Sequence, residues 1–380
     1  MDPRYFPELA QTNTNPAEDL STIGRASIKV VGLGGGGTNA VNRMIELGLT
    51  GVDFIAANTD HQALASSLAP VKLQLGPKVT RGLGAGGDPR IGAAAAMESS
   101  REIAAALKGA DMVFITAGMG GGTGTGAAPV AAEIARELGA VVVSVVTMPF
   151  AFEMTRRAQN ARRGVRALQP HSHTLITVPN DRLIALAPRG ITLEVAFRVA
   201  DDVLRQGVQA IAELITQPGL INVDFAHIRQ LMLRGGGSLM AIGLGEGEDK
   251  ARLAIHQALH HPLLDVDHFG QANGILVHFT GGDDLTLFEV SEAVDELRQQ
   301  LPPDVDLIFG ATTDATLTGR AQVILIVTGI GGSPAPVEAP AAQLAAESMA
   351  AAQPAIVGMP ADPNDLDLPT FLRRRLSLAT

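Results

Sequence analysis

Gly118-Met-Gly-Gly-Gly-Thr-Gly-Thr-Gly126 is the most informative segment of the chain. It follows a strand-like segment at 111–117 and precedes a helix-like segment at 127–138. A glycine-rich turn from a strand into a helix exposes backbone N–H groups at a helix N-terminus, and this geometry binds phosphate. Glycine lets the backbone approach a ligand closely, and the threonine hydroxyls add hydrogen-bond donors. The segment therefore predicts a phosphate-binding loop.

A second glycine run, Gly32-Leu-Gly-Gly-Gly-Gly37, follows another strand-like segment at 28–31. Asn58-Thr59-Asp60 closes a third strand-like segment at 52–57. Continuous apolar strands that alternate with helices predict a parallel sheet covered on both faces, with ligands at the carboxyl ends of its strands. We therefore expect the two loops to converge on one nucleotide polyphosphate. The spacing Gly32-x-Gly34-x-x-Gly37 also fits a dinucleotide-binding oxidoreductase, although such an enzyme needs only one loop of this kind.

Composition narrows the class of protein. The chain has 380 residues, of which 46% are hydrophobic and 18% charged, so it is expected to be globular with about two domains. It contains no cysteine, which excludes disulfides and thiolate chemistry. The net charge of -10 argues against a nucleic-acid partner. No apolar run reaches the ~18 residues of a membrane span, and the polar N-terminus lacks a signal-peptide core, so we expect a cytoplasmic protein.

The predicted elements follow from hydrophobic periodicity and helix-end signals. In the first half, strands are predicted at 28–31, 52–57, 111–116, 141–147 and 174–178, and helices at 38–47, 88–108, 127–138 and 155–168. A single long helix is predicted over 192–216. In the second half, strands are predicted at 238–245, 274–280, 305–311 and 321–328, and helices at 250–259 and 288–301.

These motifs occur in the order found in one family. The two glycine loops and Asn58-Thr59-Asp60 are joined by Gly82-Leu-Gly-Ala-Gly-Gly87, Val146-Thr-Met-Pro-Phe-Ala-Phe-Glu153, Pro179-Asn180-Asp181 and Asn222-Val-Asp-Phe225. Over residues 26–330 the chain resembles the FtsZ family, the tubulin-like bacterial cell-division GTPases. The resemblance implies an α/β, tubulin-like fold, with a Rossmann-type parallel-sheet GTPase domain, a long central helix and a smaller α+β C-terminal domain.

The resemblance and the composition together predict six segments. They are a disordered tail at 1–25, a GTP-binding domain at 26–190, a central helix at 191–218, a C-terminal activation domain at 219–330, a flexible linker at 331–362 and a partner-binding peptide at 363–380.

The resemblance also implies a GTP site. Its residues would be Gly35, Gly36, Gly37, Thr38 and Asn39 in the phosphate loop, Ala85, Gly86 and Gly87 near the γ-phosphate, Gly122, Thr123 and Gly124 at the α- and β-phosphates, Glu153 at the ribose, Arg157 beside the nucleotide, and Asn180, Phe197 and Asp201 at the guanine. A carboxylate at Asp201 pairs with the two donors of guanine and is repelled by the acceptor edge of adenine. Without the family resemblance, a solvated carboxylate on the helix explains Asp201 as well as a base contact does. Glu153 and Arg157 are then explained as a surface ion pair that contributes little to stability. The phosphate loops contain no lysine, so helix dipoles and a Mg²⁺ ion held mainly by the phosphates would offset the charge of GTP or GDP.

In this family the segment after the central helix reaches the nucleotide of the next subunit, where its acidic residues polarise the attacking water. Here that segment provides Asn222 and Asp224, but His227 stands where the family usually has a second Asp. Three interpretations of His227 remain open. The imidazole replaces the carboxylate as proton acceptor, hydrolysis is slow because an anion is missing, or His227 is an ordinary solvent-facing residue.

The C-terminal peptide at 365–375 places Leu366, Leu368, Phe371 and Leu372 between acidic and basic ends. Apolar side chains beyond a linker have no core to join, so we expect them to bind a division or membrane-tether protein. The overall hypothesis is a head-to-tail homopolymer that forms the cytokinetic ring at the division site and hydrolyses GTP between subunits. The alternatives are a non-hydrolysing structural filament that keeps GTP in its interfaces, and the dinucleotide oxidoreductase.

Overall fold

The structure is a computed structural model that describes residues 26–184, 190–217, 219–221, 223–261, 264, 272–302 and 304–330. Three of the predicted segments, 1–25, 331–362 and 363–380, lie outside the described residues, as does Asn222. Their predictions therefore stay predictions.

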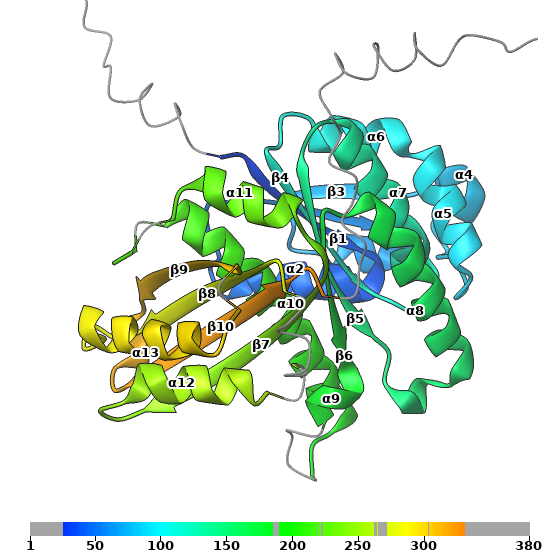
Figure 1. The fold of residues 1–380 in the computed structure, drawn as a ribbon. Coiled ribbons are helices and arrows are strands. Elements are labelled where there is room, and N and C mark those ends of the chain that lie inside the picture. The colour runs from blue at the N-terminus through cyan, green and yellow to red at the C-terminus, as the bar shows by residue number, and fades with distance from the viewer. Residues whose placement is uncertain are drawn as a thin grey trace, which may run out of the picture. The chain divides into compact units, whose positions relative to one another are not determined.

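A single sheet of ten strands runs through the described residues, in the order β3-β2-β1-β4-β5-β6-β7-β10-β8-β9 (Figure 1). Its strands are β1 (Ile28–Leu33), β2 (Asp53–Asn58), β3 (Val71–Gln74), β4 (Met112–Gly118), β5 (Val141–Met148), β6 (Thr174–Pro179), β7 (Gly236–Glu246), β8 (Gly274–Gly281), β9 (Asp306–Thr313) and β10 (Arg320–Thr328). Strands β1 to β6 pair in parallel in the order 3-2-1-4-5-6, which is the doubly wound arrangement. β10 runs antiparallel to β7 and β8, so the second half of the sheet is mixed, and the α/β prediction is confirmed.

Helices cover both faces of this sheet (Figure 1). They are α2 (Gly34–Glu46), α3 (His61–Ala65), α4 (Pro77–Thr80), α5 (Pro89–Glu98), α6 (Ser100–Leu107), α7 (Thr123–Glu137), α8 (Thr155–Leu168), α9 (Asn180–Ile184), α10 (Leu193–Thr216), α11 (Phe225–Leu233), α12 (Lys250–Leu259) and α13 (Leu287–Gln299). Successive strand residues separate into two cores, because side chains alternate across a strand. Val30 and Phe114 pack with α2 and α10 on one face, whereas Val31 and Ile115 pack with α5 to α8 on the other.

Both glycine runs enter helices earlier than the sequence predicted. We expected a helix from residue 38, but α2 begins at Gly34, and α7 begins at Thr123 rather than at residue 127. Close packing explains why glycine is needed there. A Cβ on Gly37 would lie 2.3 Å from the carbonyl oxygen of Thr116 on β4. The first turns of both helices are therefore built from the loops themselves.

The alanine-rich helix predicted over 88–108 is wrong in one respect, because the structure divides it into α5 and α6 at Ser99. The Oγ of Ser99 accepts a hydrogen bond from the backbone N–H of Gly76 at 3.0 Å. This long-range contact holds Ser99 outside helical geometry, with φ -98° and ψ 22°. Sequence periodicity carries no signal for such a contact.

Helix α10 connects the two halves of the sheet. It begins at the side chain of Thr192, which accepts from the backbone N–H of Val195, and it contacts β5 on one side and β8, β9 and β10 on the other. Ile211 and Leu214 are buried as their spacing predicts, but Val195 near the start of the helix is 44% exposed. Within the described part of the chain, no helix has the length and apolar character needed to cross a bilayer.

Candidate nucleotide-binding site

A cleft of about 370 Å³ lies at the carboxyl ends of the parallel strands, where both glycine loops meet. Its lining comes from the starts of α2 and α7, from the segment after β5, and from α9 and α10. The lining residues are Gly35, Gly36, Asn39, Gly118, Met119, Gly121, Gly122, Thr123, Gly124, Thr147, Pro149, Glu153, Arg157, Asn180, Phe197, Ala200 and Asp201. The cleft therefore brings together most of the residues that the sequence predicted for GTP.

Two helix N-termini converge on this cleft. Gly34 at the start of α2 lies against α7, because a Cβ on Gly34 would be 2.7 Å from the backbone nitrogen of Gly124. Neither helix has a side-chain cap or an acidic residue in its first turn. Their first backbone N–H groups are therefore left for a ligand, and the positive ends of two helix dipoles point to one place. This arrangement suits a polyphosphate.

The segment that ends β2 is tied to the second phosphate loop. The hydroxyls of Thr59 and Thr123 lie 2.6 Å apart, so one donates to the other. The backbone N–H of Gly84 donates to the carbonyl oxygen of Thr59 at 3.3 Å, and Asp60 pairs with Leu83 in an isolated β-bridge. These contacts hold the 82–87 loop beside the α7 N-terminus, where a Cβ on Gly122 would lie 2.8 Å from the Cβ of Ala85.

Glu153 and Arg157 form an ion pair across one turn at the start of α8. The carboxylate of Glu153 is almost buried, with 9% of its side chain exposed, and it also accepts from the backbone N–H of Phe150 at 2.9 Å. The ring of Phe150 meets Phe197 edge to face, with centroids 5.4 Å apart. The carboxylate is thus fixed on the wall of the cleft, where it can accept a hydrogen bond from a ribose hydroxyl.

The base end of the cleft carries two polar side chains for which the described residues provide no hydrogen-bond partner. The Oδ1 of Asn180 is buried and has no hydrogen-bond partner within the described residues. Burial raises the pKa of Asp201 to about 7 from its ordinary value of 3.8. A neighbouring groove of about 560 Å³ shares Asn39, Phe197 and Asp201 with the cleft. Unsatisfied acceptors next to an aromatic ring suit a flat heterocycle that carries N–H donors.

Five predicted residues do not line the cleft. Gly37 and Thr38 lie beneath it in the first turn of α2, and the Oγ1 of Thr38 is buried without a partner among the described residues. Ala85 lies beside Gly122, and Ala85, Gly86 and Gly87 do not line the cleft.

The structure adds three lining residues that the sequence prediction missed, Thr147, Pro149 and Ala200. Gly118, Met119 and Gly121 also line the cleft, and they belong to the loop that was predicted as a whole to bind phosphate. Thr147 and Pro149 stand at the carboxyl end of β5, and this position in a parallel sheet was the available signal.

Asp224 and His227 lie at the opposite end of the parallel strands from this cleft. Asp224 is the N-cap of α11, and α11 leads into β7, whose first residue Gly236 is in register with Thr174 at the start of β6. The cleft lies instead beyond the end of β6, at Asn180. Figure 1 shows this separation, with α11 at the upper left of the view and α9 at the bottom. Both side chains are exposed and neither lines the cleft.

Protein side chains alone offer little to a metal ion. Among the described residues, no group of three or more His, Asp or Glu side chains is arranged to hold one. Asp60 lies near the phosphate loops, but its Oδ1 already accepts from the backbone N–H groups of Gln62 and Ala63. A divalent ion here would draw most of its ligands from nucleotide phosphates and water.

Comparison with known proteins agrees with this geometry. Residues 27–188 match the Tubulin/FtsZ family, GTPase domain, and residues 236–331 match the FtsZ family, C-terminal domain. An FtsZ dimer structure from M. jannaschii, described as empty, has 45% sequence identity and a TM-score of 0.79, covering 84% of this chain and 93% of that chain. The chain belongs to the FtsZ family. The glycine loops therefore belong to a GTPase domain of the tubulin-like cytoskeletal type, which implies binding of GTP or GDP, and not to a dinucleotide oxidoreductase.

More distant structures share the FtsZ fold. CetZ2 from Haloferax volcanii, described as a GTPγS-bound protofilament, has 21% identity and a TM-score of 0.67, covering 85% of this chain and 99% of that chain. CetZ1 from the same organism, described as a GDP-bound monomer, has 19% identity and a TM-score of 0.68, with the same coverage. At this level of identity, the likeness concerns the fold alone.

Proposed function

We propose that this chain binds GTP in the cleft and polymerises head to tail into filaments that form the cytokinetic ring in bacterial division. GTP is hydrolysed between copies. One observation carries the proposal. The phosphate loops and the Asp224 segment lie at opposite ends of the parallel strands, which supports a role for the Asp224 of one copy at the nucleotide of another copy.

The side chains and backbone groups of the cleft and of the Asp224 segment support this proposal. Main-chain N–H groups at two helix N-termini receive the phosphates, Glu153 and Asn180 suit the ribose and the base, and Asp201 suits the guanine donors. Mg²⁺ bound to the phosphates would add positive charge where negative charge develops. Asp224 on the neighbouring copy would orient the attacking water, with Asn222 beside it in sequence.

The identity of residue 227 affects the proposed rate of GTP hydrolysis. A neutral imidazole near a polyphosphate lacks the charge of the usual second carboxylate, so we propose that hydrolysis is slow while GTP binding is intact. The same residue favours a second candidate function, a structural filament that retains GTP in its interfaces without turning it over.

Several features suit the division role. The structure of a relative with 45% identity is an FtsZ dimer, which supports the proposal that copies of this chain associate with one another. We further propose that residues 365–375 bind a division or membrane-tether protein through Leu366, Leu368, Phe371 and Leu372, at the cytoplasmic face of the division site.

The test combines assembly with complementation. Light scattering and phosphate release are measured with GTP, GDP and GTPγS, and we expect scattering with GTP and GTPγS only.

The complementation experiment mixes two variants. Asp201→Ala removes the base contact, whereas Asp224→Asn keeps the pocket. Each variant alone should release little phosphate, whereas the mixture should release more, because an intact pocket meets an intact Asp224 at some interfaces. A chain with no affinity for guanosine nucleotides, or a mixture no more active than its components, would refute the composite site. Filaments with GTP that release no phosphate would establish the structural candidate instead.

A further inference from the structure

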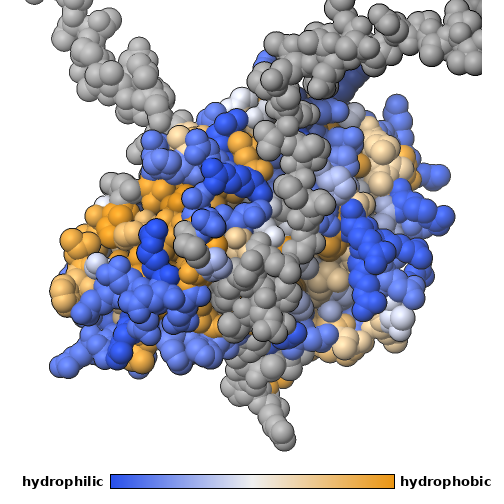
Figure 2. All heavy atoms as spheres, in the orientation of Figure 1, coloured by the Kyte–Doolittle hydropathy of each residue, from blue (hydrophilic) through white to orange (hydrophobic). Residues whose placement is uncertain are grey.

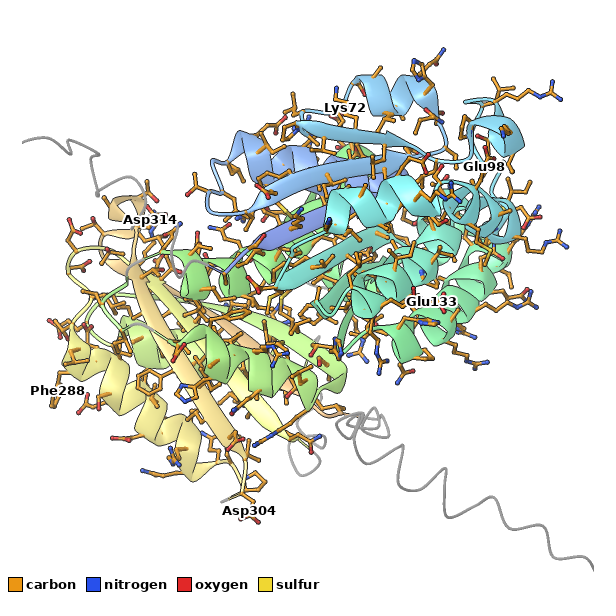
Figure 3. All side chains as sticks on the ribbon, turned by 90° about the horizontal axis from the view of Figure 1, so that it is seen from above. Lys72, Glu98, Glu133, Phe288, Asp304 and Asp314 are labelled. Carbon is orange, nitrogen blue, oxygen red and sulfur yellow. The ribbon has the colours of Figure 1, made fainter. Side chains whose placement is uncertain are left out.

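A second hollow, of about 710 Å³, lies between α5, α7 and α8 and shares no lining residue with the nucleotide cleft. We call it the α8 groove. Figure 1 shows the three helices side by side at the right of the view, and Figure 3 labels Glu133 on α7. The nucleotide site and the Asp224 segment do not use this surface.

The floor of the α8 groove is apolar. Met97 at the end of α5 is 61% exposed, and the other apolar lining residues are Pro89, Ala93, Pro129, Val130 and Ala167. An exposed methionine adapts its shape to different partners at little cost, which makes it common on surfaces that bind peptides. The floor therefore offers room for aliphatic or aromatic side chains.

The wall that α8 contributes is basic. α8 contains five arginines and no acidic residue, in a chain whose net charge is -10. Arg156 and Arg163 line the groove, and neither forms an ion pair with any residue that the structure describes. Arg90 on α5 is already paired with Asp88 at 2.7 Å, which leaves Glu133 as the unpaired acid at the rim. Figure 2 shows hydrophilic surface over this side of the molecule.

We propose that the α8 groove binds residues 362–372 of a neighbouring copy of this chain. That segment reads Asp-Pro-Asn-Asp-Leu-Asp-Leu-Pro-Thr-Phe-Leu, with three aspartates and no basic residue. In Asp365-Leu-Asp-Leu368, acidic and apolar residues alternate, so an extended backbone presents leucines to one side and carboxylates to the other. The leucines match the apolar floor, and the carboxylates match Arg156 and Arg163.

This contact goes beyond the filament function. It needs neither nucleotide nor Asp224, and it gives the C-terminal segment a second binding site besides the division partner proposed for it. A copy whose segment lies in a neighbour's groove cannot present that segment to another protein. The contact would therefore compete with partner binding and link copies in a way that does not depend on GTP.

The probe is a fluorescent synthetic peptide with the sequence of residues 362–372. The binder is the full chain carrying Asp362→Asn, Asp365→Asn and Asp367→Asn together with Leu366→Ser and Leu368→Ser, so that its own segment lacks both the carboxylates and the leucines and competes little with the probe. We expect saturable binding by fluorescence anisotropy that weakens as salt rises and is unchanged by GDP. In this background, Arg156→Glu with Arg163→Glu should weaken binding at least about tenfold.

The matched control is Arg162→Glu with Arg166→Glu. These two arginines are exposed on the same helix and do not line the groove, so both double variants change the net charge equally. Thermal unfolding verifies that each variant folds. A peptide with both leucines replaced by serine should also bind at least about tenfold more weakly, because it loses the apolar contact. The proposal is overturned if the probe shows no saturable binding up to about 1 mM, if the control pair loses as much affinity as the groove pair, or if the serine peptide binds equally well.

Discussion

The backbone N–H of His227 donates to the carbonyl oxygen of Asp224 at 3.0 Å, at the first turn of α11. The side chain of Asp224 also accepts from the backbone N–H of Ala226 at 3.1 Å. Asp224 is therefore both the helix N-cap and the candidate carboxylate for hydrolysis, with His227 one turn along. A substitution at Asp224 has two consequences that must be separated.

Asp224→Asn separates them, because asparagine caps a helix about as well as aspartate but carries no charge. We expect Asp224→Asn to retain its free energy of unfolding and to lose at least about a hundredfold in GTP turnover. Asp224→Ala should lose similar activity and, in addition, about 0.5–2 kcal/mol of stability. Phosphate release and urea unfolding on the same samples measure both effects. Unchanged turnover in Asp224→Asn would remove Asp224 from the proposed site.

His227→Asp should accelerate hydrolysis. The substitution restores a carboxylate at an exposed position, so it adds charge where the attacking water would be oriented, without a cost in packing. We expect GTP turnover to rise by up to about 10²–10⁴-fold with nucleotide affinity unchanged. His256→Asp, an exposed position on α12, controls for the change in net charge. A wild-type rate equal to that of His227→Asp would show that imidazole serves as well as carboxylate.

Asp201 should make guanine binding depend on pH. Burial raises its pKa to about 7, so near neutral pH much of the free protein holds a protonated carboxyl, which guanine's donors do not favour. GTP affinity should therefore rise between pH 6 and pH 8, by up to about tenfold per pH unit below the pKa. Asp201→Asn should bind GTP weakly with no such rise. Titration of a fluorescent GTP analogue from pH 5.5 to 8.5 tests this.

The same shift affects stability. Because the folded-state pKa of Asp201 lies above its ordinary value of 3.8, the folded state holds the proton more strongly. Asp201 therefore stabilises the protein below about pH 4, and this contribution disappears as pH rises to about 7. Asp201→Asn should remove this trend from the unfolding curves.

His278 should make stability depend on pH in the opposite direction to Asp201. It is buried on β8, with its Nε2 3.0 Å from the Oγ1 of Thr312, and burial lowers its pKa to about 4 from 6.5. Glu213 on α10 lies 4.0 Å away, but burial raises the pKa of Glu213, so desolvation favours the neutral form of both groups over an ion pair.

The folded state therefore binds fewer protons at His278 than the unfolded state between about pH 6.5 and pH 4. The contribution of neutral His278 to the free energy of unfolding is fully present above pH 6.5. It is lost as pH falls from about 6.5 to about 4, by about 3 kcal/mol in total. His278→Phe should flatten the acid limb of the stability curve, whereas His256→Gln should leave it in place. An identical acid limb in wild type and His278→Phe would show that other groups cause it.

Alanine substitutions at Gly35 and Gly37 should affect GTP affinity and stability differently. A Cβ on Gly35 meets no protein atom within 4 Å, although Gly35 lines the cleft. Gly35→Ala should fold with unchanged or slightly higher stability, since alanine favours a helix by up to about 1 kcal/mol, yet lose GTP affinity because the methyl group enters the cleft. Gly37→Ala should lose several kcal/mol, about 3 or more, because its Cβ would lie 2.3 Å from the carbonyl oxygen of Thr116. Calorimetry and nucleotide titration would distinguish them, and full GTP affinity in Gly35→Ala would place the phosphates elsewhere.

Much of the fold could be predicted from local pattern. The buried strands, α8 and α10 appear within a few residues of their expected bounds, because hydrophobic periodicity and turn residues act over short distances. The short elements β3, α3, α4 and α9 were missed, since they have too few residues for a period to show, and the helix α11 was not among the predicted elements. The division of α5 from α6 was missed for another reason, because the bond from Gly76 to Ser99 joins segments that are distant in sequence.

The sequence by itself determined the parallel sheet and the two phosphate loops, since glycine runs between strand and helix express a local backbone requirement. Only the tertiary structure decided that Gly34 meets Gly124, that Asp201 is buried enough to shift its pKa, and that Asp224 lies at the opposite end of the strands from the cleft. The physical reason is that these relationships depend on how strands are ordered and helices pack across the sheet, and such long-range contacts leave no mark on the spacing of neighbouring residues.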